Sequence, residues 1–188
     1  MNVYLLRHGE TEGGARYRGV TDDPLTENGW REMWAAVNDV VALDLIITSP
    51  LRRCAEFSQA LAQQRNVKLL VDERWRELNF GEWESMAPAR LWQEQRNALL
   101  AFWEDPVKSP PPLSEPLPEL RQRVVAAWRD CQMLAAQQNI LVVSHGGPLR
   151  VLLGAMKNIP LREVGGVAVP LASLHRVDSG FDFLEYEP

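Results

Sequence analysis

Two short apolar runs, far apart in the chain, end in the same way, and this constrains the fold more than any other feature. VYLL at residues 3–6 is followed by an arginine and His8, and ILVV at residues 140–143 is followed by a serine and His145; a glycine comes next in both. Such runs are typical of strands buried on both faces. In a parallel sheet, the carboxyl ends of the strands open onto one crevice. If the two strands are neighbours, both imidazoles therefore meet there.

The rest of the chain alternates between apolar strands and amphipathic helices. Further strands are expected at residues 44–48, 67–71, 167–177 and 181–186. Helices are expected at residues 27–42, after Ser49-Pro50, near Ala87, over 120–134 and from Pro148 to Leu153. This alternation predicts an α/β fold, a three-layer αβα sandwich around a mostly parallel sheet.

The length of 188 residues fits a single domain over residues 1–188, without an internal repeat or linker. Residues 105–118 hold six prolines, which predict a stiff surface loop rather than a helix or strand. This loop is either a simple surface turn or a cover over a bound molecule. We favour the cover.

Composition and charge exclude several classes of function. The formal net charge of -5 argues against non-specific binding of nucleic acid, which needs a basic surface. No apolar run approaches a membrane span, and the charged residues that begin at Arg7 interrupt the first run too early for a signal peptide. Two cysteines, Cys54 and Cys131, make a disulfide framework unexpected. We therefore expect a cytoplasmic protein with reduced thiols.

Arginines accompany the histidines in the predicted crevice. Arg7 precedes His8, residues 52–53 are both arginine at the start of a predicted helix, and two more lie on the glycine-bearing loop 12–19. Nearby cations favour a neutral imidazole, which can attack phosphorus. Preorganised donors also stabilise the charge on a phosphoryl group during its transfer. The pattern indicates phosphoryl chemistry.

Five short segments follow one another in a fixed order. They are RHGET at 7–11, PLTENG at 24–29, SPLRR at 49–53, ELNFGEWE at 77–84 and VVSHGG at 142–147. Together they resemble the signatures of the histidine phosphatase superfamily, the clan of cofactor-dependent phosphoglycerate mutases and related phosphatases. Each segment alone is a weak signal, but the five in order extend over nearly the whole chain. The resemblance implies a phosphoglycerate mutase-like fold.

The resemblance also implies roles for individual residues. His8 would be the nucleophile that forms a phosphohistidine. Glu77 would protonate the leaving alcohol and then activate water. Arg7, Arg53 and His145 would bind the phosphoryl group, with His145 also counted among the catalytic residues.

Further substrate contacts follow from the same motifs, and they are Thr11, Arg18, Gly19, Glu115 and Gly146. Gly14 stands where the family often has asparagine, so that phosphate ligand is either missing or replaced by a backbone N–H or by Arg18. Phe57 stands where threonine is common, which we expect to affect packing more than chemistry. No metal and no cofactor are implied, because the sequence has no carboxylate cluster at ligand spacing and the arginines neutralise the phosphoryl charge.

The length and the Glu77 segment narrow the choice within the clan. Mutases carry a longer segment after the catalytic glutamate, and phosphohistidine-protein phosphatases generally lack the glutamate segment. This combination is most similar to the α-ribazole phosphatases. The resemblance implies that the substrate is a small phosphomonoester, α-ribazole 5′-phosphate in cobalamin biosynthesis. We expect the protein to be a monomer or a homodimer. Trp75, Trp83 and Trp103 stand near the predicted mouth, where they either pack or contact an aromatic leaving group.

Other functions stay open at this point. They are a phosphoglycerate mutase, a broad-specificity sugar phosphatase, a non-catalytic phosphate-binding relative, and a metal-binding protein using His8, His145 and His175.

Overall fold

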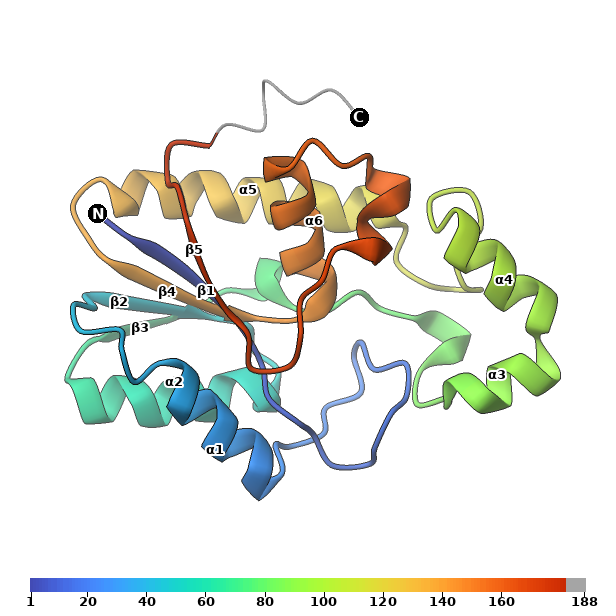
Figure 1. Cartoon of the computed structure of the whole chain (residues 1–188), viewed down its shortest axis with the longest axis horizontal. Helices are drawn as coiled ribbons and strands as arrows, with labels where there is room; N and C mark the ends of the chain where they lie inside the picture. Colours follow the sequence, from blue (N-terminus) through green and yellow to red (C-terminus); the bar gives the residue numbers. More distant parts are fainter. Residues whose placement is uncertain (182–188) are drawn as a thin grey trace.

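The computed structural model describes residues 1–181, and within them the chain is built on a five-stranded sheet (Figure 1). In chain order the strands are β1 (Val3–Arg7), β2 (Leu45–Thr48), β3 (Lys68–Val71), β4 (Ile140–Ser144) and β5 (Leu174–Val177). Their spatial order is β3-β2-β4-β1-β5. Strands β1 to β4 are parallel, and β5 is antiparallel to β1. The mostly parallel sheet is confirmed.

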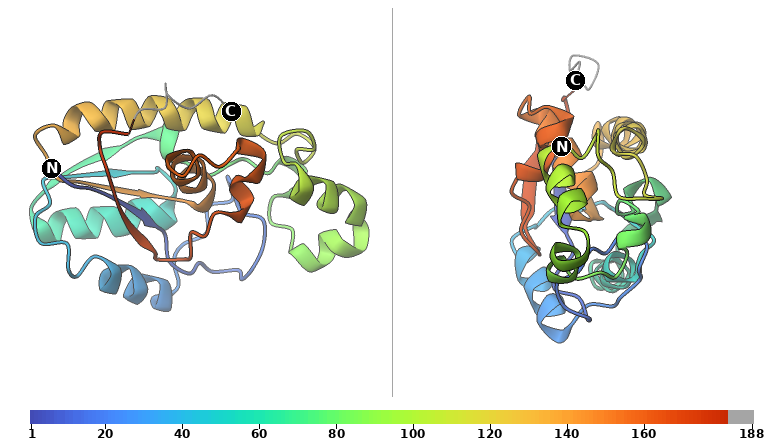
Figure 2. Two further views of the ribbon diagram at one scale, coloured as in Figure 1. Left: turned by 45° about the horizontal axis from the view of Figure 1, so that its top comes forward. Right: turned by 90° about the vertical axis from the view of Figure 1, so that its right-hand side faces the viewer.

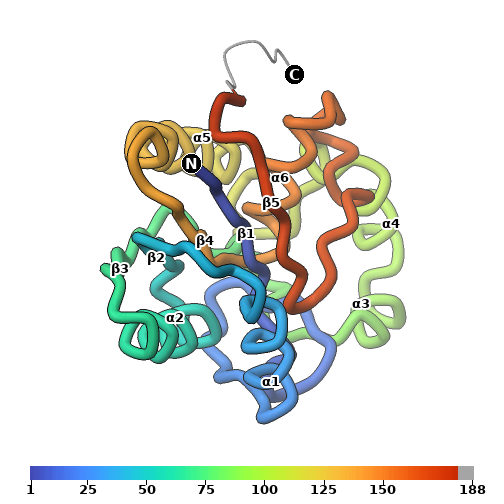
Figure 3. Tube along the Cα trace, turned by 60° about the vertical axis from the view of Figure 1, so that its left-hand side comes forward, coloured from blue at the N-terminus to red at the C-terminus, as the bar shows by residue number. Residues whose placement is uncertain are grey.

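Helices cover both faces of this sheet, as Figure 3 shows. They are α1 (Glu27–Ala36) and α2 (Arg52–Arg65) on one face, and α5 (Leu117–Ala135) and α6 (Gly146–Met156) on the other. Successive side chains of a strand point to opposite faces. Leu5 of β1 accordingly packs in the core with α5 and α6, whereas Leu6 packs in the core with α1 and α2. The three-layer αβα arrangement is confirmed.

Two short helices stand beyond the end of the sheet, where Figures 1 and 2 both place them at one end of the molecule. They are α3 (Pro88–Glu94) and α4 (Arg96–Glu104), where the sequence predicted one short helix near Ala87. Gln95 separates them, because its backbone angles, φ -138° and ψ 37°, are not helical. Its side chain accepts a hydrogen bond from the indole of Trp83 at 2.9 Å. The pair has its own small apolar cluster, formed by Trp83, Leu91 and Leu99.

Several predicted boundaries were wrong, each for a local reason. The helix predicted over 27–42 ends at Ala36, and Arg65 of α2 donates to the carbonyls of Val37 and Val40 beyond its end. Helix α6 begins at Gly146 rather than at Pro148, because a proline in the first turn of a helix needs no N–H partner there.

The last part of the chain differs most from the prediction. The strand predicted over 167–177 is confined to Leu174–Val177, and the residues before it form the irregular approach that includes Pro170. The strand predicted over 181–186 falls, apart from residue 181, outside the described residues. The proline-rich stretch 105–118 forms turns up to the start of α5, as predicted, apart from its last two residues. Between residues 1 and 181, no helix has the length and hydropathy needed to cross a bilayer.

Candidate active site

The two histidines that follow the apolar strands meet at one edge of the sheet. Strands β1 and β4 are parallel neighbours, with Arg7 opposite Ser144. The backbone N–H of His8 donates to the carbonyl of Ser144 at 3.0 Å. The rings of His8 and His145 lie edge to face, with centroids 5.2 Å apart. The meeting of the imidazoles, which depended on adjacent strands, is therefore observed.

His8 is held as a neutral imidazole, and only one of its ring nitrogens has a hydrogen-bond partner within residues 1–181. Its Nδ1 lies 2.8 Å from the carbonyl oxygen of Gly9, and because a carbonyl only accepts, Nδ1 carries the proton. Burial and the nearby guanidinium of Arg53 hold the pKa of His8 well below its ordinary value. The lone pair of Nε2 is then available for nucleophilic attack.

His145 is neutral too, but both of its nitrogens are engaged by the protein. Its Nδ1 accepts from Nε of Arg53 at 3.1 Å, so the proton is on Nε2, which donates to Oγ of Ser49 at 2.7 Å. Burial, followed by the charge of Arg53, holds the pKa of His145 well below its ordinary value. His145 and Arg53 are fully buried at the base of the site.

Arg53 is fixed by the loop that carries Gly19. Its Nη1 and Nη2 donate to the carbonyls of Thr21 and Gly19, each at 2.8 Å. The carboxylate of Glu84 in turn accepts the backbone N–H groups of residues 19–21 and the hydroxyl of Thr21. Three of the five N–H donors of Arg53 are used, and the other two have no hydrogen-bond partner among residues 1–181. Gly19 thus lies against Arg53.

Arg7 supplies the exposed part of the cationic floor. Its Nη1 donates to the carbonyl of Val169 at 2.6 Å. Its Nε is buried and has no hydrogen-bond partner within residues 1–181. A buried donor of this kind costs free energy until an acceptor reaches it. A phosphoryl oxygen in the adjoining cavity would be such an acceptor.

Glu77 faces this floor from a different element, the chain that follows the short 3₁₀ helix η1 (Glu73–Trp75). Its Oε1 accepts from the backbone N–H of Leu78 at 2.8 Å and from that of Gly147 at 3.0 Å. Gly147 lies in the first turn of α6, where the helix dipole favours a carboxylate. A Cβ at Gly147 would collide with that carboxylate. Sequence reasoning missed Gly147, although the double glycine after His145 was a signal.

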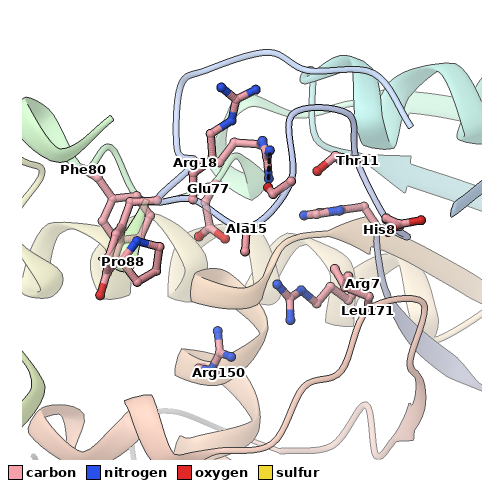
Figure 4. Close-up of a pocket in the computed structure, with 14 residues that line it drawn as sticks. Arg7, His8, Thr11, Ala15, Arg18, Glu77, Phe80, Pro88, Arg150 and Leu171 are labelled. Carbon is pink, nitrogen blue, oxygen red and sulfur yellow. Dashed lines mark hydrogen bonds between the residues drawn. The ribbon is translucent and has the colours of Figure 1, made fainter. Parts of the chain in front are cut away.

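Arg7, His8 and Glu77 line a cavity of about 490 Å³, as Figure 4 shows, and we call it the polar cavity for the charged side chains in its lining. Arg53 and His145 are fully buried and are not among the residues that line it. A second cavity of about 310 Å³ adjoins it beyond Glu77. This second cavity, which we call the apolar chamber, is lined by Phe80, Phe102, Trp103, Pro110, Leu117 and Leu120, among others. The two cavities share Tyr17, Glu77, Phe80 and Arg150. The carboxyl group therefore stands between a cationic site and an apolar one.

The remaining predicted substrate contacts lie in different parts of the site. Thr11 and Arg18 line the polar cavity, as Figure 4 shows. The guanidinium of Arg18 is already paired with the carboxylate of Asp23 at 2.5 Å. Gly146 begins α6 and lies beside Arg7. Glu115 lines the apolar chamber, but its carboxylate is held by another side chain, described below.

The structure also places the residues at which this chain differs from the family motifs. Gly14 lines the polar cavity in a left-handed conformation, φ 71°, and its carbonyl accepts from Arg18 at 2.9 Å. Phe57 is fully buried and packs edge to face on Trp34, which confirms a packing role. The thiol of Cys54 lies 3.4 Å from the carbonyl of Ser144, and burial raises its pKa.

The three tryptophans singled out from the sequence divide between core and chamber. Trp75 and Trp83 are fully buried and pack, whereas Trp103 is 53% exposed and lines the apolar chamber. In residues 1–181, histidines, cysteines and carboxylates do not gather into a group of three that could hold a metal ion.

Comparisons with known proteins agree with this geometry. The chain is 32% identical over 182 residues to "Probable phosphoglycerate mutase GpmB" of Shigella boydii, covering 95% of this chain and 85% of the relative. Among solved structures, YhfR of Bacillus stearothermophilus is 28% identical with a TM-score of 0.86, covering 94% of this chain and 90% of that one. The α-ribazole phosphatase of Shigella flexneri is 27% identical with a TM-score of 0.82, covering 95% and 90%.

The family model of the histidine phosphatase superfamily (branch 1) matches residues 3–183. This match includes both strand-end histidines, the arginines around them and Glu77, which the five motifs had singled out. The resemblance noted in the sequence is confirmed, and the chain belongs to the histidine phosphatase superfamily.

Proposed function

We propose that this protein hydrolyses phosphomonoesters through a phosphohistidine on His8. The observation that carries the proposal is the free Nε2 of a neutral His8, which shares a cavity with Arg7 and Glu77. In the first step Nε2 forms a bond to phosphorus while the ester P–O bond breaks. The electron pair stays on the ester oxygen, which takes a proton from the carboxyl group of Glu77.

The second step regenerates the enzyme. A water molecule attacks the phosphorus and gives a proton to the Glu77 carboxylate. The N–P bond breaks, and its electron pair returns to Nε2 of His8. Glu77 therefore acts first as an acid and then as a base, and both roles need it within hydrogen-bond reach of the reacting oxygen.

Cations and donors at the floor stabilise the phosphoryl group during both steps. We assign this role to the unpartnered Nε of Arg7 and to the two remaining N–H donors of Arg53. His145 contributes from beneath, where its contact with Arg53 orients the guanidinium.

The direct test is to trap the covalent intermediate. The wild-type enzyme, mixed with a ³²P-labelled phosphomonoester and quenched in base, should retain label that acid releases, as expected for a phosphohistidine. The His8→Ala variant should retain none and should lose turnover. Label that survives acid, or label retained by His8→Ala, would contradict the assignment of the nucleophile.

For the substrate we propose α-ribazole 5′-phosphate, with a role in cobalamin biosynthesis. The apolar chamber next to Glu77 offers aromatic and proline side chains to the flat base of this leaving group. The similarity to the α-ribazole phosphatase of Shigella flexneri supports this choice. The single domain over residues 1–188, a monomeric or homodimeric state and a cytoplasmic location stay predictions.

Arg150 favours a second candidate, a substrate whose leaving group carries an anion. It lines both cavities, its Nε donates to the carbonyl of Val167 at 3.1 Å, and it forms no ion pair within the described residues. A carboxylate on the leaving group, as in 3-phosphoglycerate, would suit this cation. A phosphoglycerate mutase would bind its substrate in this way, whereas α-ribazole has no second anion.

The Arg150→Met variant distinguishes the two candidates. If α-ribazole 5′-phosphate is the substrate, its kcat/KM should change less than about 3-fold, because the leaving group is neutral. If 3-phosphoglycerate is the substrate, its KM should rise by about 10-fold or more, the value expected for losing a charged hydrogen bond. Comparing the wild-type kcat/KM for the two esters and for a simple sugar phosphate identifies the preferred one.

A further inference from the structure

One arginine that lines neither cavity, Arg123, forms hydrogen bonds to the backbone on and before Glu77. Arg123 lies on α5, with a side chain only 13% exposed. Its Nε and Nη2 donate to the two carboxylate oxygens of Glu115, at 2.6 and 2.9 Å. Its Nη1 and Nη2 also donate to three backbone carbonyls, those of Arg74, Arg76 and Glu77, at 2.7, 2.6 and 3.0 Å. We call Arg123 and Glu115 together the clasp.

Two of the three carbonyls, those of Arg76 and Glu77, belong to the irregular stretch that delivers Glu77 to the site, and that of Arg74 lies in η1 just before it. Residues 76–79 follow η1 and belong to no strand or helix, so they lack the regular hydrogen bonds of a sheet. Backbone carbonyls outside regular secondary structure need donors from elsewhere, and here a side chain supplies them. The planar fork of a guanidinium fixes the directions of several acceptors at once, which a lysine ammonium does not.

Glu115 links the same backbone stretch to the wall of the apolar chamber. Its backbone N–H donates to the carbonyl of Asn79 at 2.9 Å, and its side chain lines the chamber. The end of the proline-rich stretch is thereby joined to the residues on both sides of Glu77. Because the Glu115 carboxylate is occupied by Arg123, the structure gives it a holding role rather than a direct contact with substrate.

We infer that Arg123 and Glu115 are positioning residues that aim the carboxyl group of Glu77 at the leaving oxygen. The inference rests on the proposed function, because it gives Glu77 the role of general acid. The carboxyl group reaches Gly147 on α6 from a backbone that Arg123 on α5 holds. Without the clasp the backbone is free to shift, and a shift near 1 Å is enough to impair transfer of a proton.

The leaving group separates this role from a general loss of structure. When an alkyl ester reacts, the proton of Glu77 goes to the ester oxygen as the P–O bond breaks. When p-nitrophenyl phosphate reacts, the phenolate departs with the electron pair and needs no proton. The value of kcat/KM reports the steps up to formation of the phosphohistidine, so it isolates this difference.

The experiment compares Arg123→Gln with wild type on α-ribazole 5′-phosphate, an alkyl ester, and on p-nitrophenyl phosphate. We expect kcat/KM for the alkyl ester to fall about 10- to 100-fold, part of the contribution of a general acid, and that for the aryl ester to fall less than about 3-fold. The control is Arg129→Gln, an exposed arginine on the same helix, which should match wild type on both esters.

Each outcome decides the matter. Equal losses on the two esters, or no loss on either, would overturn the inference. If Arg123→Gln fails to fold, Arg123→Lys is measured in the same way. A larger loss of kcat/KM for the alkyl ester than for the aryl ester would then support the inference, and equal losses would overturn it. Wild-type enzyme that turns over neither ester and traps no phosphate would instead overturn the proposed function, and with it the acid role of Glu77.

Discussion

The floor of the polar cavity and the walls of the apolar chamber are built in different ways. The floor consists of residues at strand ends and helix starts, and its buried members, His145 and Arg53, are held by several hydrogen bonds each. The chamber is lined mainly by α4, the proline-rich stretch and the first turn of α5, and Trp103 in its lining is half exposed. The floor is therefore suited to one fixed reaction, and the chamber to a choice of leaving group.

The largest effect is expected at the boundary of the two regions, for Glu77→Gln. The amide keeps an oxygen for the N–H groups of Leu78 and Gly147 but has no acidic proton. We expect kcat for an alkyl phosphate to fall about 10²- to 10⁴-fold with little change in the melting temperature. Glu82→Gln, an exposed carboxylate nearby, is the control and should keep wild-type kcat. A loss below 10-fold would remove Glu77 from the chemistry.

The two regions should also differ in what an arginine contributes to stability. Arg53→Met leaves the carbonyls of Gly19 and Thr21 without donors, so we expect the free energy of unfolding to fall by about 2–4 kcal/mol. Arg150→Met, facing both cavities, should change it by less than about 0.5 kcal/mol. Urea denaturation measures both. Equal effects would mean that the floor is no more tightly constructed than the chamber.

The free energy of unfolding should depend on pH because two histidines of the floor are buried. In the unfolded chain His8 and His145 bind protons below pH 6.5, but in the folded protein their pKa values are lowered well below that value. Unfolding then takes up protons, so stability decreases as the pH falls below 6.5, by about 1.4 kcal/mol per pH unit for each histidine. In the His8→Asn variant, the contribution of one histidine to this pH dependence of the unfolding free energy should be missing between pH 6.5 and 5. An unchanged slope would show that His8 is not buried as neutral imidazole.

The smallest effect is expected in the chamber wall. Trp103→Ala removes an exposed aromatic ring whose indole N–H donates to the hydroxyl of Tyr17 at 3.0 Å. For an ester with an aromatic leaving group we expect KM to rise about 3- to 10-fold, since one ring contact is worth about 1 kcal/mol. For a small sugar phosphate KM should not change. Equal changes for both esters would argue against an aromatic leaving group in the chamber.

Sequence reasoning was strongest where short-range patterns carried the information. The apolar runs before His8 and His145 predicted both strands, and the order of the motifs identified the family. It was weaker where a boundary depends on a partner from elsewhere, as at the end of α1, which Arg65 of α2 holds. The split between α3 and α4 depends similarly on Gln95 and the indole of Trp83.

The amino-acid sequence by itself determined the type of sheet, the two histidines at strand ends and the family. Hydrophobic runs and short motifs are local properties, and they survive without knowledge of the partners. Only the tertiary structure decided that both nitrogens of His145 are engaged, that Arg53 and His145 form the buried part of the floor, and that Glu115 faces Arg123. The contacts of His145 with Arg53 and Ser49 join residues dozens of positions apart, and no local pattern encodes such pairings.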